Sequence, residues 1–281
     1  MKQVFDLKDF KETGVSWPFK LQNISNIDLE HEYFEFQKKA KEKLNHAISL
    51  KPNLLSTLFD SMVFDTEVVR VVKAVLGDDI YAWSSAFFPK EPKNNKIVSY
   101  HQDNPYWQLS TSNVVSIWIA LTKSDKKSGA LEVVPHSSKL GLINDLDVKN
   151  PRESYLKGEK TTDENDMLSY KQNLQDFIKK NKPLHVELSP GEFSVHHVNT
   201  VHGSGPNISN NHRIGFAIRY ISSDTIHLVE KNDSAIHVCG KKNTFLEHEE
   251  RPKISFSAEA IKEYQKAMNS AGAFGNKIYT K

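Results

Sequence analysis

A histidine and a carboxylate stand two positions apart in the segment Tyr100-His101-Gln102-Asp103. β-Branched and aromatic residues precede them, so a strand is predicted to end near Tyr100. If the backbone stays extended, strand alternation points His101 and Asp103 to the same side. One imidazole and one carboxylate on one side are two-thirds of the facial triad that holds non-haem Fe(II) and leaves the opposite coordination positions open for oxygen chemistry. The third ligand must then come from a distant strand.

A second histidine-centred segment runs from Val201 through His202 to Arg213. A strand is predicted to end at His202, where Gly203 and Gly205 allow a tight turn beside a ligand. The next strand opens with Arg213, whose planar guanidinium matches a carboxylate. Because a buried guanidinium is costly without an anion, this pattern indicates a dicarboxylic cosubstrate.

Two other segments combine histidine with carboxylates, namely residues 185–187 (His-Val-Glu) and residues 248–250 (His-Glu-Glu). The first is interpreted as the polar, solvent-facing stripe of a strand. The second is interpreted as a charged surface run before a proline. Neither segment is followed by a basic residue that matches Arg213, which opens the strand after His202. Both segments therefore rank below the first two as candidate metal sites.

The elements that must position these residues can be predicted from apolar periodicity. Residues 27–50 show helical spacing, and Pro52 ends or restarts that helix. A second helix is predicted over 65–76, with Gly77 as its C-cap. From about residue 80 onward, short runs rich in β-branched and aromatic residues predict strands at 80–83, 97–100, 114–121, 130–134, 184–188, 192–198 and 214–221. Strands at this spacing indicate an antiparallel barrel or sandwich.

The 281 residues are predicted to form a single domain. Residues 1–79 make a mainly helical N-terminal part, and residues 80–222 make the β core. The polar segment 144–182 interrupts this core and is interpreted either as a lid or binding loop or as a solvated excursion. Residues 223–281 form a C-terminal extension with one helix near 258–268.

Composition and charge exclude several classes of partner. The net charge is +2, the sequence pI is about 8.4, and the lysines are scattered, which argues against a nucleic-acid partner. The single cysteine, Cys239, cannot form a disulfide framework, which fits a reducing cytosol. No stretch approaches the ~20 apolar residues of a membrane span, and the N-terminus has no apolar signal region. A cytoplasmic location without a membrane partner is therefore expected.

Three ordered blocks of sequence carry a resemblance to a known family. The blocks are residues 87–92 (Phe-Phe-Pro-Lys-Glu-Pro); residues 101–107 (His-Gln-Asp-Asn-Pro-Tyr-Trp) continuing through 118–122 and 128–137; and residues 190–192 (Pro-Gly-Glu) with 202–207 (His-Gly-Ser-Gly-Pro-Asn) through Arg213. Together they resemble the phytanoyl-CoA dioxygenase family of Fe(II)/2-oxoglutarate oxygenases, most strongly over 80–222. One departure is the turn 135–138, where the family usually has Pro-Gly-Ser-His and this chain has Pro-His-Ser-Ser.

The resemblance implies a mostly β fold with flanking helices around a double-stranded β-helix (jelly-roll) core of the cupin kind. It implies that His101, Asp103 and His202 bind Fe(II) and are the catalytic residues. Four residues are implied to bind the cosubstrate 2-oxoglutarate: Arg213, Ser204, Lys90 and Trp118. The first two would hold its distal carboxylate, the other two would line its pocket, and O2 would be the second cosubstrate.

Substrate contacts are expected on the loop after the metal-binding pair, because loops concentrate such contacts. One more is expected from the strand of Arg213, on the same face by alternation, although an arginine there can also make a structural ion pair. The candidate substrate-binding residues are Gln102, Asn104, Tyr106, Trp107 and Arg219. His196 and His197 are interpreted as structural.

The expected reaction is hydroxylation of an unactivated C–H bond in a small polar metabolite, with release of succinate and CO2. Halogenating relatives carry a small residue in place of the carboxylate, so Asp103 argues against chlorination. Candidate substrates are a modified amino acid, a phosphonate or another polar intermediate. The alternatives are desaturation or oxidative ring closure with the same cofactors, a cupin-type metal enzyme without 2-oxoglutarate, and a catalytically inactive jelly-roll binding protein. A monomer or a weak homo-oligomer is expected.

Overall fold

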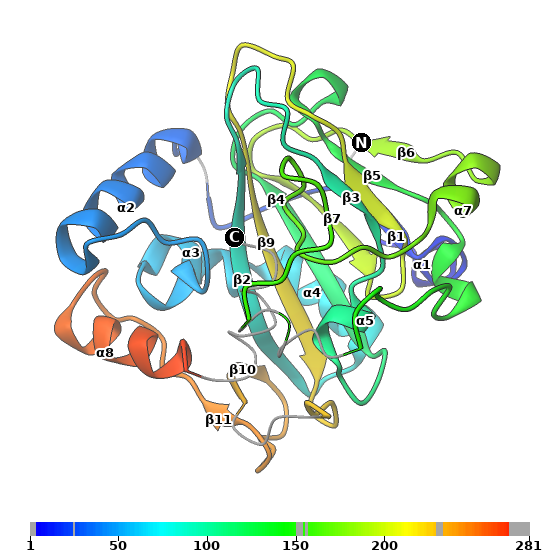
Figure 1. Cartoon of the computed structure of the whole chain (residues 1–281). Helices are drawn as coiled ribbons and strands as arrows, with labels where there is room; N and C mark the ends of the chain where they lie inside the picture. The colour runs from blue at the N-terminus through cyan, green and yellow to red at the C-terminus, as the bar shows by residue number, and fades with distance from the viewer. Residues whose placement is uncertain (1–3, 25, 150–153, 155–156, 229–232, 270–281) are drawn as a thin grey trace.

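Two β-sheets face each other in the computed structural model, which describes residues 4–24, 26–149, 154, 157–228 and 233–269 (Figure 1). The large sheet consists, in pairing order, of β1 (Val15–Lys20), β7 (Glu192–His197), β4 (Val114–Ala120), β9 (Arg213–Ser222), β2 (Ile80–Lys90), β10 (Ser234–Cys239) and β11 (Glu247–His248). The small sheet consists of β3 (Val98–His101), β8 (His202–Ser204), β5 (Leu131–Val133) and β6 (Leu184–Val186). Every strand pair is antiparallel except β10 with β11, so the predicted jelly-roll core is confirmed.

Helices cover the face of the large sheet that points away from the small sheet (Figure 1). The described residues form α1 (Leu7–Thr13), α2 (Leu29–Leu44), α3 (Thr57–Val63), α4 (Thr66–Leu76), α5 (Asn104–Trp107), α7 (Gln175–Lys180) and α8 (Ala258–Ala267), with short 3-10 turns at Pro52–Leu54, Lys126–Ser128 and Ser137–Leu140. Of these, α5 and α7 lie on the side of the small sheet and not on the covered face. Residues of α2, α3, α4 and α8 belong to the same hydrophobic core cluster as the outer face of the sheet. The flanking helices that the sequence predicts therefore serve to bury that face.

The central strand β4 sends its residues alternately into two different environments. Val115, Ile117 and Ile119 join the core under the helices. Ser116 and Trp118 face the small sheet and line a cavity there. Strand alternation thus keeps one face of the sheet apolar and frees the other for chemistry.

Strand β9 follows the same rule. Ile214, Phe216 and Ile218 join the helix-covered core, whereas Arg213 and Arg219 line the cavity between the sheets. All ten residues of β9 are buried, so both arginines are inside the protein. A buried arginine is costly unless its charge is balanced, which makes these two positions candidates for function.

The large sheet takes in more of the chain than residues 80–222. Strand β1 lies at one edge beside β7, and β10 and β11 extend the other side. The sequence analysis missed β1 because Pro18 lowers the strand signal; at a sheet edge a proline is tolerated, since its missing N–H has no ladder partner to satisfy. The main core cluster runs from Phe5 to Ala267, so all three predicted parts of the chain contribute to one core.

The predicted lid-like segment 144–182 is anchored beside the metal-binding segment. Its residue Gln172 accepts a hydrogen bond from the backbone N–H of Gln102 at 2.6 Å. Residues 150–153 and 155–156 of this segment, and 229–232 and 270–281 of the C-terminal extension, lie outside the described residues. None of the helices in the described part of the chain combines the length and apolar character that a membrane span requires.

A buried ion pair joins the N-terminal part of the chain to the C-terminal extension. The Nζ atom of Lys51 contacts Oε1 of Glu249 and also donates to the carbonyl oxygens of Trp83 at 3.0 Å and Ser234 at 3.3 Å. Both charged side chains are at most 3% exposed. We expect Lys51→Met to lower the free energy of unfolding by about 3–5 kcal/mol, because Glu249 would stay buried without its cation.

Urea unfolding of the single and double variants tests this. The double variant Lys51→Met/Glu249→Leu removes both charges and should regain most of the lost stability. If the double variant is as unstable as Lys51→Met alone, an uncompensated carboxylate is not the cause of the loss.

Candidate metal centre

Three ligand-type side chains converge between the two sheets. Strand β3 pairs with β8 so that His101 lies directly opposite His202. Nε2 of His101 is 3.5 Å from Oδ1 of Asp103, and Nε2 of His202 is 3.9 Å from the same oxygen. One ligand atom from each residue lies within 4.8 Å of the others, and all three residues are buried. This arrangement could hold one metal ion on three adjacent positions.

The structure corrects the reason why Asp103 joins the two histidines. The sequence analysis placed it on extended backbone, where alternation would point it to the side of His101. Instead β3 ends at His101, and Asp103 has helical backbone angles (φ −70°, ψ −34°) as the residue before α5. Its backbone N–H donates to the carbonyl oxygen of Val198 at 3.1 Å, which fixes the bend. The carboxylate therefore reaches the histidines from a turn and not from the strand.

Both histidines are oriented by backbone carbonyl groups. Nδ1 of His101 lies 2.8 Å from the carbonyl oxygen of Ser99, and Nδ1 of His202 lies 2.9 Å from that of Thr200. A carbonyl oxygen can only accept, so each Nδ1 carries the proton and each Nε2 presents its lone pair to the site. Metal-binding histidines are typically held in this way.

Burial and electrostatics set the protonation states that a metal requires. Burial, followed by the neighbouring imidazole of His101, lowers the pKa of His202 well below its ordinary value, so this imidazole is neutral at pH 7. Burial by itself raises the pKa of Asp103. The effects of His202, His101 and Arg219 outweigh burial, so the pKa of this carboxyl lies below its ordinary value. A neutral imidazole and an ionised carboxylate are the ligating forms.

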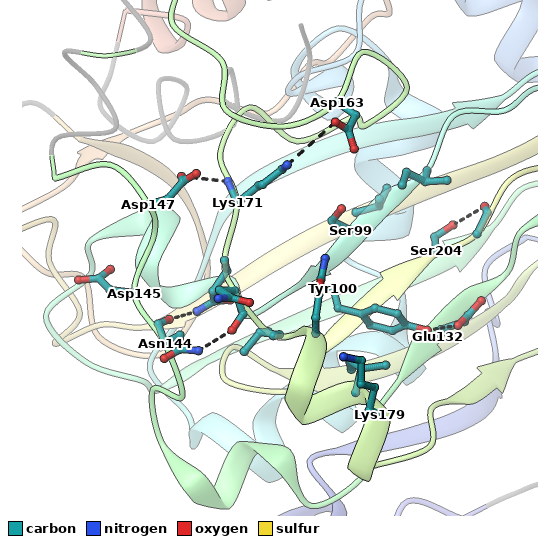
Figure 2. A pocket seen from close by; sticks show the side chains of 18 residues that line it. Ser99, Tyr100, Glu132, Asn144, Asp145, Asp147, Asp163, Lys171, Lys179 and Ser204 are labelled. Atoms are coloured by element: carbon teal, nitrogen blue, oxygen red, sulfur yellow. Dashed lines mark hydrogen bonds and ion pairs between the residues drawn. The ribbon is translucent and has the colours of Figure 1, made fainter.

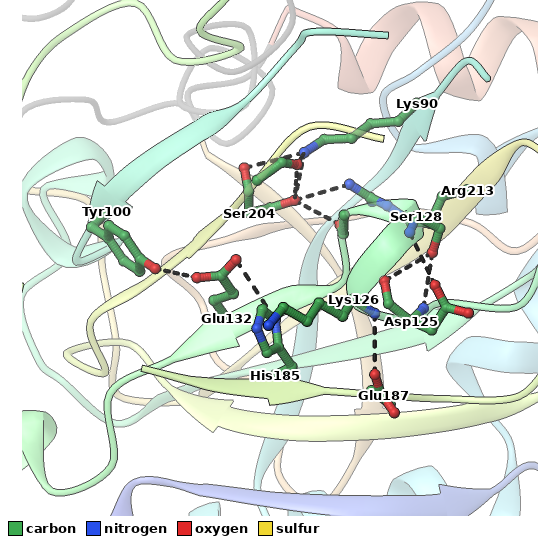
Figure 3. Close-up of polar contacts among 12 residues, drawn as sticks. Lys90, Tyr100, Asp125, Lys126, Ser128, Glu132, His185, Glu187, Ser204 and Arg213 are labelled. Atoms are coloured by element: carbon green, nitrogen blue, oxygen red, sulfur yellow. Dashed lines mark hydrogen bonds and ion pairs between the residues drawn. The ribbon is translucent and has the colours of Figure 1, made fainter. Parts of the chain in front are cut away.

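A second polar cluster lies where β2 and β9 approach β8. Arg213 donates from Nη1 to the carbonyl oxygen of Phe88 at 3.1 Å. It also donates from Nη2 to Oγ of Ser204 at 3.2 Å (Figure 3). Its Nε is buried and makes no hydrogen bond among the described residues. Burial alone lowers the pKa of Arg213 to about 10, and no carboxylate forms an ion pair with it in the described part of the chain. A cation in this state suits an incoming carboxylate.

Ser204 links Arg213 to Lys90. Nζ of Lys90 donates to Oγ of Ser204 at 2.5 Å and to the carbonyl oxygen of Gly205, while Oγ of Ser204 donates to the carbonyl oxygen of Gly129 at 2.8 Å (Figure 3). Burial and then the charge of Arg213 lower the pKa of Lys90 to about 6. Lys90 is not among the residues that line the cavity, so it lies behind Ser204 instead of facing the cosubstrate pocket.

Trp118 lines the cavity and is held against β9 by a glycine. The guanidinium of Arg213 lies 5.5 Å from the centre of the Trp118 ring. A Cβ added to Gly215 would overlap the indole, since even its Nε1 would be only 2.9 Å away and two ring carbons would be closer. Gly215 is a functional position that the sequence analysis missed; a glycine within a strand otherwise rich in apolar residues was the available signal.

We expect Gly215→Ala to displace Trp118 and to cost about 1–3 kcal/mol of stability, because the strand cannot move away from a close-packed ring. The displaced ring would also disturb Arg213, so the 2-oxoglutarate concentration needed for half-maximal turnover should rise. Thermal unfolding and steady-state kinetics measure the two effects. Gly205→Ala is the control in thermal unfolding for the general cost of replacing a glycine, because its φ is outside the left-handed region and a new Cβ would meet only Oε1 of Glu132, at 3.5 Å.

The predicted substrate contacts on the loop after His101 are mostly used in packing. The side chain of Gln102 is buried and hydrogen-bonds three backbone groups, the carbonyl oxygens of Gly141 and Asn199 and the N–H of Ile143. This geometry favours a structural role for Gln102. It fixes the loop that carries Asp103.

The other predicted substrate contacts of this loop also lie outside the cavity lining, namely Asn104, Tyr106 and Trp107. The hydroxyl of Tyr106 donates to the carbonyl oxygen of Tyr170 at 2.5 Å, and its ring meets the His101 ring edge-on at 5.7 Å. Trp107 packs edge-on against Trp83 at 5.6 Å. Asn104 is half-buried at the start of α5.

Arg219, in contrast, lines the cavity together with the metal triad. His196 lines it too, with its ring 4.7 Å from that of His202, although the sequence analysis interpreted it as structural. Ser116 lines it as well, and the signal for Ser116 was its place as the one polar residue within the apolar run 114–121. The volume of this cavity is about 50 Å³, so the described residues enclose the site closely.

A wider cleft of about 900 Å³ adjoins this cavity and shares Val98 and Ser204 with it. Figure 2 shows Tyr100, Glu132 and Lys179 around this cleft, together with residues from the segment 144–182. The hydroxyl of Tyr100 donates to the carboxylate of Glu132 across it. The larger hollow is therefore beside the metal triad and not around it.

Comparison with known proteins agrees with the geometry of the site. The model of the phytanoyl-CoA dioxygenase family matches residues 25–215, well over half of the chain. The chain belongs to the phytanoyl-CoA dioxygenase family. It is a non-haem iron dioxygenase that uses 2-oxoglutarate. The triad suits the metal, and the buried guanidinium of Arg213 suits a carboxylate of the cosubstrate.

Individual relatives of this dioxygenase are distant. A protein of Stutzerimonas stutzeri described as a probable alpha-ketoglutarate-dependent hypophosphite dioxygenase is 25% identical over 269 residues, covering 88% of each chain. The apo form of the non-heme monooxygenase ThoJ has a TM-score of 0.76 at 22% identity and covers 96% of this chain and 97% of its own. The alpha-ketoglutarate-dependent carbocyclase SnoK from nogalamycin biosynthesis has a TM-score of 0.58 at 18% identity, with 78% and 84% covered. These two structures support the fold.

Proposed function

We propose that this dioxygenase hydroxylates an unactivated C–H bond of a small polar metabolite, with His101, Asp103 and His202 as the iron ligands. The observation that carries the proposal is the convergence of this triad on a cavity that the buried Arg213 also lines. The intact triad and family membership argue against a binding protein without catalysis. Arg213 and Ser204 argue against a cupin-type enzyme that needs no 2-oxoglutarate.

The residues of the chain have distinct tasks in this proposal. When bound, Fe(II) and 2-oxoglutarate would supply the oxidising chemistry, which would convert O2 and 2-oxoglutarate into succinate, CO2 and the hydroxylated substrate. His101, Asp103 and His202 would hold the metal from one side, which would leave coordination positions for the cosubstrate and O2. Arg213, supported by Ser204, holds the distal carboxylate. The buried walls exclude water, which keeps the oxidant from reacting unproductively.

The substrate is small and polar in this proposal. The S. stutzeri relative is named for hypophosphite, a compact oxyanion, and this supports a small polar substrate. Modified amino acids and phosphonates remain the first compounds to screen.

The experiment is a screen of succinate release by the Fe(II)-loaded enzyme with 2-oxoglutarate and pools of small polar metabolites, followed by mass spectrometry of the product. A mass gain of one oxygen atom supports hydroxylation. A loss of two hydrogen atoms instead means desaturation or ring closure by the same cofactors. The proposal fails if no small polar compound raises succinate release above the substrate-free rate while a large acyl thioester does.

A further inference from the structure

A row of polar residues crosses the inner face of the large sheet beside the metal triad. Ser116 on β4 pairs with His196 on β7 on one side and with Arg219 on β9 on the other. All three are buried, with 2%, 3% and 4% exposure, and all three line the triad cavity. Residues in register on adjacent strands project to the same face, so their side chains form one surface.

This row lies at the opposite end of the cavity from the 2-oxoglutarate site. Arg219 follows Arg213 by six residues on β9, which separates their backbone positions by about 20 Å. The triad lies near the row, since Oγ of Ser116 is 3.5 Å from Oδ2 of Asp103 and the His196 ring is 4.7 Å from that of His202. Arg219 is therefore placed on the side of the metal away from Arg213, where a substrate would have to lie.

The row is preorganised to bind a ligand. The guanidinium of Arg219 lies 5.3 Å from the Phe88 ring and 5.6 Å from the Trp107 ring, and cation–π contact with both fixes its plane. Nδ1 of His196 is buried and makes no hydrogen bond among the described residues. A buried polar atom without a protein partner next to a cavity is suited to a ligand atom.

Charge decides what kind of ligand this is. Among the described residues that line the cavity, Asp103 carries negative charge, and Arg213 and Arg219 carry positive charge. Fe(II) and the 2-oxoglutarate dianion bring equal and opposite charges. The loaded site therefore keeps one surplus positive charge, and a single anionic group on the substrate would neutralise it.

We infer that Arg219, with Ser116 and His196, forms an anion-binding subsite that selects a substrate carrying a carboxylate or a phosphorus oxyanion. The inference rests on the proposed function and narrows its substrate class from small and polar to small and anionic. Arg219 holds the anion by charge-assisted hydrogen bonds, and the other two residues position it.

The test uses the anaerobic Fe(II)·2-oxoglutarate complex of the full chain, so that Arg213 is already occupied. Acetate, methylphosphonate and acetamide are titrated in turn, and binding is followed by calorimetry and by the change in the iron–2-oxoglutarate absorption band. Acetate and acetamide have nearly the same shape and differ in charge. At least one anion should bind about 10-fold or more tightly than acetamide, and the better anion identifies the class.

Variants at Arg219 complete the test. Arg219→Met should weaken binding of the preferred anion by about 10- to 100-fold, and Arg219→Lys should lose less. The absorption band of the complex without added anion reports the joint binding of iron and 2-oxoglutarate, independently of the anion. A missing band in the wild-type protein contradicts the proposed function, whereas a normal band with equal binding of acetate and acetamide overturns only the anion subsite. The anion subsite is also overturned if Arg219→Met binds the anion as tightly as the wild-type protein does, or if this variant loses 2-oxoglutarate binding and keeps anion binding.

Discussion

Replacing His101 with alanine is expected to abolish both iron retention and 2-oxoglutarate turnover. The imidazole lies opposite His202 across the β3–β8 pair and is one of three ligands in the triad. Losing a ligand should weaken Fe(II) binding by more than the about 10- to 100-fold that loss of a supporting residue costs. Turnover should fall by about 1000-fold or more, because 2-oxoglutarate and O2 react only at the bound metal. Iron content by mass spectrometry and succinate release measure the two effects.

His185→Ala is the matched control. His185 lies on β6 within 3.7 Å of Glu132, outside the residues that line the triad cavity, and it belonged to one of the competing His–Glu segments. This variant should keep its iron and its turnover. If His101→Ala retains full turnover, or His185→Ala loses its iron, the triad is assigned to the wrong residues.

Arg213→Met is expected to raise the half-saturating 2-oxoglutarate concentration by about 100-fold or more while iron binding survives. The buried guanidinium supplies the charge that the distal carboxylate needs, and truncating one partner of a buried charge pair leaves the other uncompensated. Turnover at saturating 2-oxoglutarate should fall much less. Arg213→Lys should recover only part of the affinity, since an ammonium cannot form two parallel hydrogen bonds.

Arg70→Met is the control for the general effect of replacing an arginine with methionine away from the site. Its side chain is 46% exposed on α4 and pairs with Glu67 one helical turn away. Steady-state kinetics over a wide range of 2-oxoglutarate concentrations separates the variants. An equal loss of iron and 2-oxoglutarate binding in Arg213→Met would count against a specific role in holding the carboxylate.

The sequence was sufficient where a pattern is local. Helical spacing predicted α2 and α4, runs of β-branched residues predicted the central strands, and the order of three motif blocks predicted the jelly roll. The histidines of the triad were also predictable from their distinctive segments, and β3 does end at His101. The prediction that a strand ends at His202 was wrong, because β8 begins at His202 and continues through Gly203 to Ser204. These features depend on neighbours in the chain.

The sequence was insufficient where a feature depends on strand register. Nothing near Ser116 in the chain indicates that it lies between His196 and Arg219, because that row is set by pairing among β7, β4 and β9. The overlap that makes Gly215 necessary arises from Trp118 on a neighbouring strand. Gln102 and Tyr106 looked available for substrate, yet both are used to hold the loop that carries Asp103.

The most direct test of the account is the visible spectrum of the wild-type protein under anaerobic conditions. Addition of Fe(II) and then 2-oxoglutarate should produce a weak charge-transfer band near ~500 nm, because the cosubstrate chelates an iron held by one face of side chains. The band should be absent in His101→Ala and should need far more 2-oxoglutarate in Arg213→Met. A wild-type sample that holds one iron per chain and shows no band at saturating 2-oxoglutarate would contradict the proposed site.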